Sequence, residues 1–222
     1  MFRRIVFVAA LAGLIAGLIT SGAQALRVVP LIHHAELYEK AAETAIASAQ
    51  HHRDAAGWVP AEGLERVGLT VVANVLAGIG FGFLLAAAFT LSGAADWRRG
   101  LLWGVAGFAT FTLAPSLGLP PEVPGAHAAL LLDRQIWWIG TVAATGIGLA
   151  LIVFSRRRLL ALAGVGLIVM PHVIGAPQTA GQGSAPAGLA QDFIIAALLT
   201  SLLFWLVLGA AAGFLFKRLS AA

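Results

Sequence analysis

Hydrophobic residues gather in six runs along the chain, and short polar segments separate them. A helix rises 1.5 Å per residue, so crossing about 30 Å of hydrocarbon takes roughly 20 apolar residues. The third and fifth runs are somewhat short, and the others reach that length. The pattern predicts an all-α, polytopic membrane protein with about six transmembrane helices, forming one integral membrane domain over residues 1–222. The runs cover residues 5–26, 67–91, 100–118, 135–154, 159–176 and 192–215.

The charges of the polar segments differ between the two sides that six spans would create. On one side the charged residues are Lys and Arg, with Asp96 as the single acid. Short basic segments remain in the cytoplasm, so both termini are expected there. The opposite side holds the other acids and all six histidines, a ligand set and a field suited to cations. The basic residues are Arg3, Arg4, Arg98, Arg99, Arg156, Arg157, Arg158, Lys217 and Arg218.

The composition excludes a soluble protein. Hydrophobic residues make up 59% of the chain and charged residues only 11%, with a mean hydropathy of +0.90, whereas a soluble domain is about one-quarter charged. The chain has no cysteine, which excludes disulfides, thiolate metal sites and a thiol nucleophile. A metal site would need imidazole, carboxylate, amide or carbonyl ligands, and these favour borderline or hard divalent ions.

The first run allows two interpretations. It has the charged start, the apolar middle and the Ala23-Gln24-Ala25 tail of a secretory signal peptide. Its apolar part is long for such a signal, and Gly13 and Gly17 form a small-xxx-small face suited to helix packing. We favour a retained first helix, which also gives an even number of spans.

The longest polar segment, residues 27–66, is predicted to be an outer loop that carries an alanine-rich helix outside the membrane. This helix is expected over Leu31–Arg53 and to begin after Pro30. His33 lies three residues before Glu36, which would place an imidazole beside a carboxylate. Two histidine pairs bracket the helix, and we interpret them as transient metal ligands; a solvated amphipathic helix is the alternative. The paired residues are His33, His34, His51 and His52.

The fifth run ends in a segment, residues 170–177, with the sequence Met-Pro-His-Val-Ile-Gly-Ala-Pro. His172 would lie about one turn inside the outer end of the span, between Pro171 and Pro177, which free backbone carbonyls. An imidazole at membrane depth beside irregular backbone is a candidate site for a metal ion or a proton. The alternative is a histidine at the water interface that hydrogen-bonds a neighbouring helix.

The third run leads into a proline-rich exit, residues 118–125, in which Glu122 is the single carboxylate. The prolines fix φ and stiffen this segment. Glu122 is therefore either an exposed loop acid or a cation ligand held in place by its neighbours. Trp137 and Trp138 follow and are expected to anchor the next helix at the outer membrane interface.

A weak internal repeat relates residues 67–125 to residues 135–177. The sequence Gly-Ile-Gly occurs at 78–80 and again at 146–148, and each half ends in a similar Pro-Gly-Pro exit. A dinucleotide-binding loop would need a preceding strand, so the glycines are better explained as close helix contacts. We interpret the halves as a parallel duplication, a feature typical of transport proteins whose broken helices meet at the substrate.

Several motifs together resemble one family. They are Met1-Phe2-Arg3-Arg4, Glu36-Leu37-Tyr38-Glu39, Gly57-Trp58-Val59-Pro60 and the segments 99–104, 118–125, 135–138 and 171–177. The chain resembles the CbtA family, the predicted cobalt transporter subunit, from Met1 to about Lys217. The resemblance implies a multi-pass protein of the bacterial inner membrane, linked to cobalt supply for cobalamin synthesis. It also implies a small single-span, histidine-bearing partner subunit called CbtB.

These features predict a cobalt uptake transporter subunit. Co²⁺ would be gathered by the paired histidines and passed to a site built from Glu36, Glu122 and His172. No prosthetic group is expected, and by the Irving–Williams order Ni²⁺ would bind at least as well as Co²⁺. The alternative is a non-transporting membrane subunit that binds metal and stabilises or regulates a partner permease.

Other classes of function are disfavoured by motifs that the sequence lacks. It has no Walker motif, so energy would come from a gradient, the membrane potential or a separate protein. It has no HExxH or GxSxG motif, so an enzyme is not expected. The expected partners are a divalent metal ion, the lipid bilayer and a CbtB-like subunit, with homo-oligomers left open and no nucleic acid.

Overall fold

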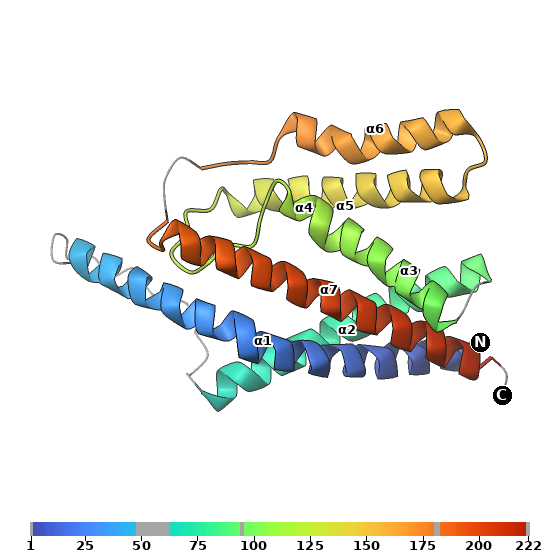
Figure 1. Ribbon diagram of the computed structural model, residues 1–222, viewed down its shortest axis with the longest axis horizontal. Helices are drawn as coiled ribbons and strands as arrows, with labels where there is room; N and C mark the ends of the chain where they lie inside the picture. Colours follow the sequence, from blue (N-terminus) through green and yellow to red (C-terminus); the bar gives the residue numbers. More distant parts are fainter. Residues whose placement is uncertain (1, 48–62, 94–95, 180–182, 221–222) are drawn as a thin grey trace.

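The computed structural model describes residues 2–47, 63–93, 96–179 and 183–220, and every regular element within these ranges is a helix (Figure 1). This confirms the all-α prediction. The elements are α1 (Phe2–Ala47), α2 (Leu64–Ser92), α3 (Trp97–Phe108), the π-helix η1 (Ala109–Leu113), α4 (Ala114–Ser116), α5 (Leu131–Phe154), α6 (Arg158–Ile174) and α7 (Ala187–Arg218).

Four helices are long and apolar enough to cross a membrane, by length and composition: α1, α2, α5 and α7. The other two predicted spans are present as shorter helical runs. One is α6, with 17 residues. The second is the continuous run α3–η1–α4, which the π-helix interrupts before Pro115. The count of about six spans therefore stays a prediction.

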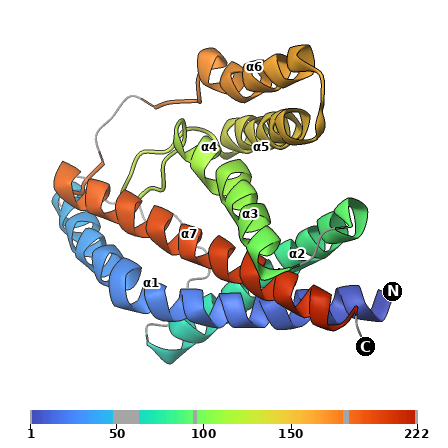
Figure 2. The same cartoon turned by 45° about the vertical axis from the view of Figure 1, so that its right-hand side comes forward.

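The helix predicted to begin after Pro30 is instead the continuation of α1, so that boundary was wrong. α1 runs through Pro30 to Ala47 and is curved along its length (Figure 2). A proline inside a helix removes one hydrogen bond and bends the axis, but packing on both sides can hold the helix together. Val28 and Ala35 supply that packing, because both are buried in a cluster with Val123 and Phe193. Residues 48–62, with His51 and His52, lie outside the described residues.

Glycines let two pairs of helices approach closely. A Cβ on Gly78 of α2 would lie 2.5 Å from the carbonyl oxygen of Gly13 in α1, so this position has room only for hydrogen. Gly100 of α3 and Gly209 of α7 meet in the same way, backbone against backbone. The interpretation of Gly78 as a close helix contact is confirmed, as expected where small residues bring membrane helices together.

The main core joins the first helices of the chain to the last. α1, α2 and α7 contribute side chains that are almost fully buried, and Phe89 is completely enclosed. Rings from several helices contact one another inside it, such as Phe81 and Trp205 with centroids 4.7 Å apart. The buried members are Val8, Ala12, Ala16, Leu85, Ala86, Phe89, Phe204, Trp205, Leu208, Ala212 and Phe216.

Helices α5 and α6 form a separate antiparallel hairpin, joined by the close approach of Gly148 and Gly164. Its packing against the rest of the described chain runs mainly through η1 and α4 (Figures 1 and 2). In contrast, α2 packs mainly on α1, and α3 packs mainly on α7. The helices of the first half of the proposed repeat thus pack on α1 and α7, whereas those of the second half pack on each other. The duplication stays a prediction.

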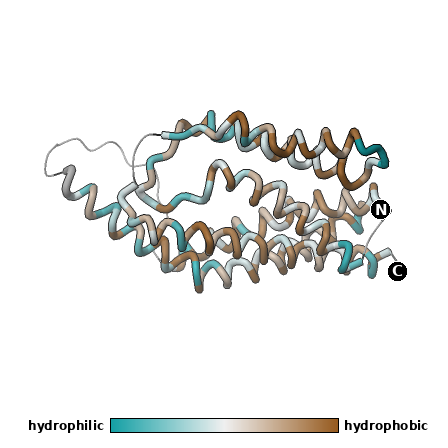
Figure 3. The backbone as a smooth tube through the Cα atoms, turned by 45° about the horizontal axis from the view of Figure 1, so that its top comes forward, coloured by the Kyte–Doolittle hydropathy of each residue, from teal (hydrophilic) through white to brown (hydrophobic). Residues whose placement is uncertain are grey.

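The polar segments lie at the two ends of the helices, and the middle sections are hydrophobic (Figure 3). Both termini and the connection from α5 to α6 lie at one end (Figure 1). There, Arg4 Nη1 donates to Ser220 Oγ at 2.9 Å, and its guanidinium covers the Phe216 ring at 4.3 Å. The candidate metal ligands that the structure describes, on the second half of α1, the loop before α5 and the end of α6, lie at the opposite end.

Candidate functional site

His172 lies in the last turn of α6, which stays helical through Pro171 and ends at Ile174. The backbone is helical at His172 itself and becomes irregular after Ile174, where Gly175, with a φ of 88°, ends the helix. The carbonyl oxygen of Pro171 accepts two hydrogen bonds, from Gly175 N at 3.1 Å and from Trp137 Nε1 at 3.2 Å. A second helix thus holds the end of α6 in place.

The imidazole of His172 presents a nitrogen that has no partner. Its Nε2 is buried and makes no hydrogen bond with any described residue. The ring meets Trp137 edge to face, with centroids 5.9 Å apart and an interplanar angle of 70°. A buried polar atom without a partner is costly, and in native proteins it commonly has a bound water or ion. Nε2 is thus the atom of this histidine best placed to bind a ligand.

Trp137 is partly buried and packs against neighbouring helices, and its predicted place at the membrane interface stays a prediction. Its indole covers Gly118, where any side chain would overlap the ring. It therefore connects the end of α4, the end of α6 and its own helix α5. The neighbouring Trp138 is more exposed, at 37%, and lies near Phe111 of η1. Nothing in the hydrophobic pattern distinguished these two tryptophans.

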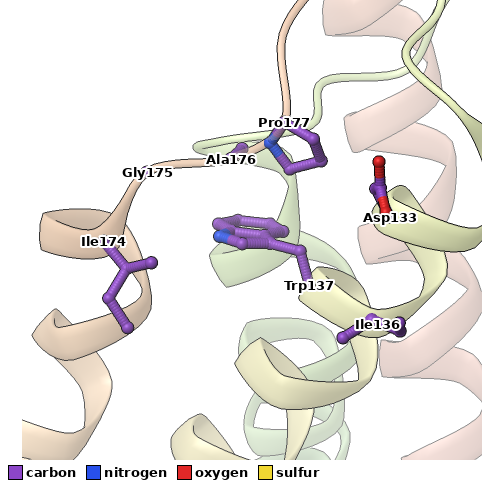
Figure 4. Close-up of a pocket in the computed structure, with 7 residues that line it drawn as sticks. All are labelled: Asp133, Ile136, Trp137, Ile174, Gly175, Ala176 and Pro177. Atoms are coloured by element: carbon purple, nitrogen blue, oxygen red, sulfur yellow. The ribbon is translucent and has the colours of Figure 1, made fainter.

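A pocket of about 370 Å³ lies in front of Trp137, between the start of α5 and the segment that follows α6 (Figure 4). Asp133 is the one charged residue that lines it. From the sequence, Asp133 was expected to be a snorkelling or paired charge at the head of its helix, and it lies in the first turn of α5. The other lining residues are Ile136, Trp137, Ile174, Gly175, Ala176 and Pro177.

Glu122 is paired with a cation in this structure. Arg134 Nη2, from α5, donates to Glu122 Oε2 at 2.8 Å, and both side chains are about 30% exposed. The loop that carries Glu122 is fixed by its neighbour Val123, which is buried against α1 and α7. Glu122 thus lies in a loop that Val123 anchors against α1 and α7, and the stiffness expected from the prolines stays a prediction.

Glu36 lies between a cation and a histidine. Arg66, in the first turn of α2, donates to Glu36 Oε1, and His33 Nδ1 lies 3.3 Å from Glu36 Oε2. The predicted neighbourhood of His33 and Glu36 is confirmed. The contact of Arg66 with Glu36 was not predicted, and it connects the start of α2 to α1.

His34 lines a second pocket, of about 420 Å³, between α1 and the beginning of α7. Its other lining residues are Leu37, Tyr38, Pro186 and Leu189. His33 and His34 are both exposed, so water and ions can reach them.

Within the ranges that the structure describes, no three His, Asp or Glu side chains are grouped so that they could hold a metal ion. His33 and Glu36 are adjacent, but Glu36, Glu122 and His172 do not form such a group. The metal-binding roles of His33, His34, Glu36, Glu122 and His172 therefore stay predictions. So do those of His51 and His52.

Comparisons with known proteins give one result. Neither the curated proteins nor the solved structures contain a match to this chain. A family model described as "Probable cobalt transporter subunit (CbtA)" matches residues 2–217, nearly the whole chain. The apolar helices and the histidines and acids at one end of the bundle agree with a membrane protein that handles a metal cation. The chain belongs to the CbtA family of probable cobalt transporter subunits.

Proposed function

We propose that this chain is the subunit through which Co²⁺ is taken up across the inner membrane of a bacterium for cobalamin synthesis. In this arrangement six helical runs span the membrane, both termini lie in the cytoplasm, and the end with His172 faces outward. The family supports cobalt as the cargo. The basic residues near both termini support the orientation, since short basic segments remain inside.

The buried and unpaired Nε2 of His172 is the single observation that carries the proposal. Imidazole is a ligand that Co²⁺ prefers over water, and this nitrogen is held by packing against Trp137 and not by a competing hydrogen bond. One imidazole does not fill the coordination sphere of Co²⁺. Waters and the carboxylates at the same end of the bundle complete it.

Glu122 and Glu36 become available to the ion by exchanging partners. Each is bound to an arginine in a partly exposed ion pair, and such pairs contribute only about 0–1 kcal/mol. A divalent cation attracts a carboxylate more strongly than a monovalent guanidinium does, so the ion displaces Arg134 or Arg66 at little cost. His33, His34, His51 and His52 gather ions ahead of these acids.

The driving force is electrical. A doubly charged ion entering a cell at a membrane potential of 100 mV gains about 4.6 kcal/mol. Ni²⁺ gains the same and binds imidazole at least as tightly, so preference for cobalt depends on coordination geometry. A CbtB-like subunit is the proposed partner and would supply further histidine ligands.

Uptake of radioactive Co²⁺ into proteoliposomes that contain this chain alone tests the proposal. We expect His172→Ala and Glu122→Gln each to lower the initial rate at least tenfold. His127→Ala is the matched control, because His127 is an exposed histidine at the same end and is not assigned a ligand role. It should leave the rate unchanged.

Two outcomes would contradict this proposal in different ways. If the native chain carries no Co²⁺ but a CbtB-like partner restores flux, this chain is a metal-binding subunit of a larger permease. If flux is present and His172→Ala behaves like His127→Ala, transport proceeds without the buried imidazole and the assigned site is wrong.

A further inference from the structure

The pocket in front of Trp137 presents oxygen atoms that lack donors. The last carbonyls of a helix have no partner within the helix and point along its axis past the C-terminal end. Among the described residues, no backbone N–H donates to the carbonyls of His172, Val173 or Ile174. Pro177 has no N–H to offer, and Gly175 donates to Pro171 instead. Of the three residues with these carbonyls, only Ile174 lines the pocket, beside Gly175 (Figure 4).

Asp133 adds a full negative charge to the same pocket. It is exposed and makes no ion pair with any residue that the structure describes. The nearest base along the chain, Arg134, is already bound to Glu122. The partial negative charge at the C-terminus of α6 acts in the same direction as the carboxylate. The N-terminal end of α5 carries the opposite partial charge, so Asp133 is the group that gives the lining of this pocket its negative charge, and the polar atoms it offers a cation are oxygens.

The size of the pocket indicates which form of the ion it accepts. Water in the liquid occupies about 30 Å³ per molecule, so an ion with six waters takes up roughly 200 Å³. The pocket is open to solvent and has a volume of about 370 Å³, so there is room for a hydrated ion.

Trp137 lies between this pocket and His172. It lines the pocket, whereas His172 does not, and its ring is in edge contact with the imidazole. A single hydrogen bond of 3.2 Å, to the carbonyl of Pro171, fixes the indole against α6. The same indole also packs over Gly118, so it fills the space between the pocket and the imidazole.

We propose that the pocket formed by Asp133 and the free carbonyl end of α6 is the first binding position for a hydrated divalent cation, and that Trp137 separates it from His172. This inference rests on the proposed function for its cargo and direction. It assigns a site that uses oxygen ligands alone and precedes the imidazole.

Binding of Mn²⁺ to the chain in lipid nanodiscs, followed by electron paramagnetic resonance, tests the site separately from transport. Mn²⁺ favours oxygen ligands over imidazole, so Asp133→Asn should weaken its binding about tenfold, as expected for loss of one charge near the ion. Asp192→Asn, an exposed acid on α7, is the control and should bind as the native chain does. Native affinity in Asp133→Asn would overturn the proposal.

Quenching of tryptophan fluorescence by Co²⁺ tests the role of Trp137. A bound Co²⁺ quenches only a nearby ring, so Trp137→Phe should remove most of the saturable quenching, while Trp138→Phe should retain it. Equal quenching in Trp137→Phe and the native chain would show that the ion binds elsewhere.

The variant His172→Gln distinguishes this inference from the proposed function. It should leave Mn²⁺ affinity within twofold of native and abolish Co²⁺ uptake. If the chain carries no Co²⁺ but Asp133→Asn still weakens Mn²⁺ binding, the transport proposal fails and the outer site stands. If Co²⁺ uptake is normal in Asp133→Asn and Mn²⁺ binding is unchanged, the outer site fails alone.

Discussion

Two glycines of α2, only two residues apart, should respond in opposite ways to the same substitution. Gly78 is buried against Gly13 of α1, whereas Gly80 is exposed and has no atom within 4 Å of the position where a Cβ would lie. Gly78→Ala and Gly80→Ala therefore add the same methyl group to the same helix. Only in Gly78→Ala does this methyl group meet the backbone of another helix.

The expected difference follows from one distance. A Cβ on Gly78 would lie 2.5 Å from Gly13 O, roughly 1 Å short of the contact distance of about 3.5 Å. Both substitutions remove a helical glycine, which stabilises by about 0.5–1 kcal/mol. Overpacking in Gly78→Ala opposes this gain by about 1–3 kcal/mol. Gly80→Ala should thus exceed Gly78→Ala by about 1–3 kcal/mol in its free energy of unfolding.

Unfolding of the purified chain in mixed micelles, titrated with sodium dodecyl sulfate and followed by circular dichroism, measures this difference. Each variant is compared with the native chain at the same micelle composition. If Gly78→Ala unfolds at the same point as Gly80→Ala, the approach of α1 to α2 does not depend on this glycine pair.

Two further predictions use the same assay. Asn74 Nδ2 donates to Ser21 Oγ at 3.0 Å and to Gln24 Oε1 at 2.7 Å, so Asn74→Leu should lower the free energy of unfolding by about 0.5–1.5 kcal/mol; a native value would mean that these bonds add no stability. Asp96 accepts from Arg99 N at 2.8 Å at the start of α3, and this bond lowers the pKa of the carboxyl below its usual 3.8. A carboxyl whose pKa is lowered in the folded state stabilises the fold at pH values above its usual pKa. This stabilisation is lost as the pH falls through the lowered pKa. The stability difference between the native chain and Asp96→Ala should therefore narrow below pH 3.8, and an equal difference at neutral and strongly acidic pH would contradict this.

The hydrophobic pattern predicted the helices well, because each apolar run must satisfy its own backbone in a membrane and only a helix does so. It failed where contacts between segments far apart in the sequence determine the local structure. Pro30 is a local signal to begin a helix, yet Val28 and Ala35 are buried against Val123 and Phe193, and this packing keeps α1 continuous. The π-helix before Pro115 has no hydrophobic signature. The missing N–H of that proline was the one available indication of irregular hydrogen bonding.

The sequence predicted individual residues of the candidate site but not the contacts between helices that position them. Proximity along one helix is readable from spacing, and His33 and Glu36 are neighbours as predicted. Pairing between helices is not readable in this way, so Arg66 beside Glu36 and Arg134 beside Glu122 were missed. Trp137 was assigned to the membrane interface from its residue type, whereas its contact with His172 depends on how α5 and α6 pack.

The core that unites α1, α2 and α7 has a consequence for biosynthesis. The ribosome completes α2 at residue 92 and α7 only at residue 218, which takes roughly 6 to 25 s more at about 5–20 residues per second. Through that interval the core residues of α1 and α2, such as Val8, Ala12 and Phe89, lack the part of their cluster that α7 supplies. The newly inserted helices must therefore be shielded by lipid or by the insertion machinery until the last helix arrives, and a chain that stops before Phe204 should be a substrate for membrane proteolysis.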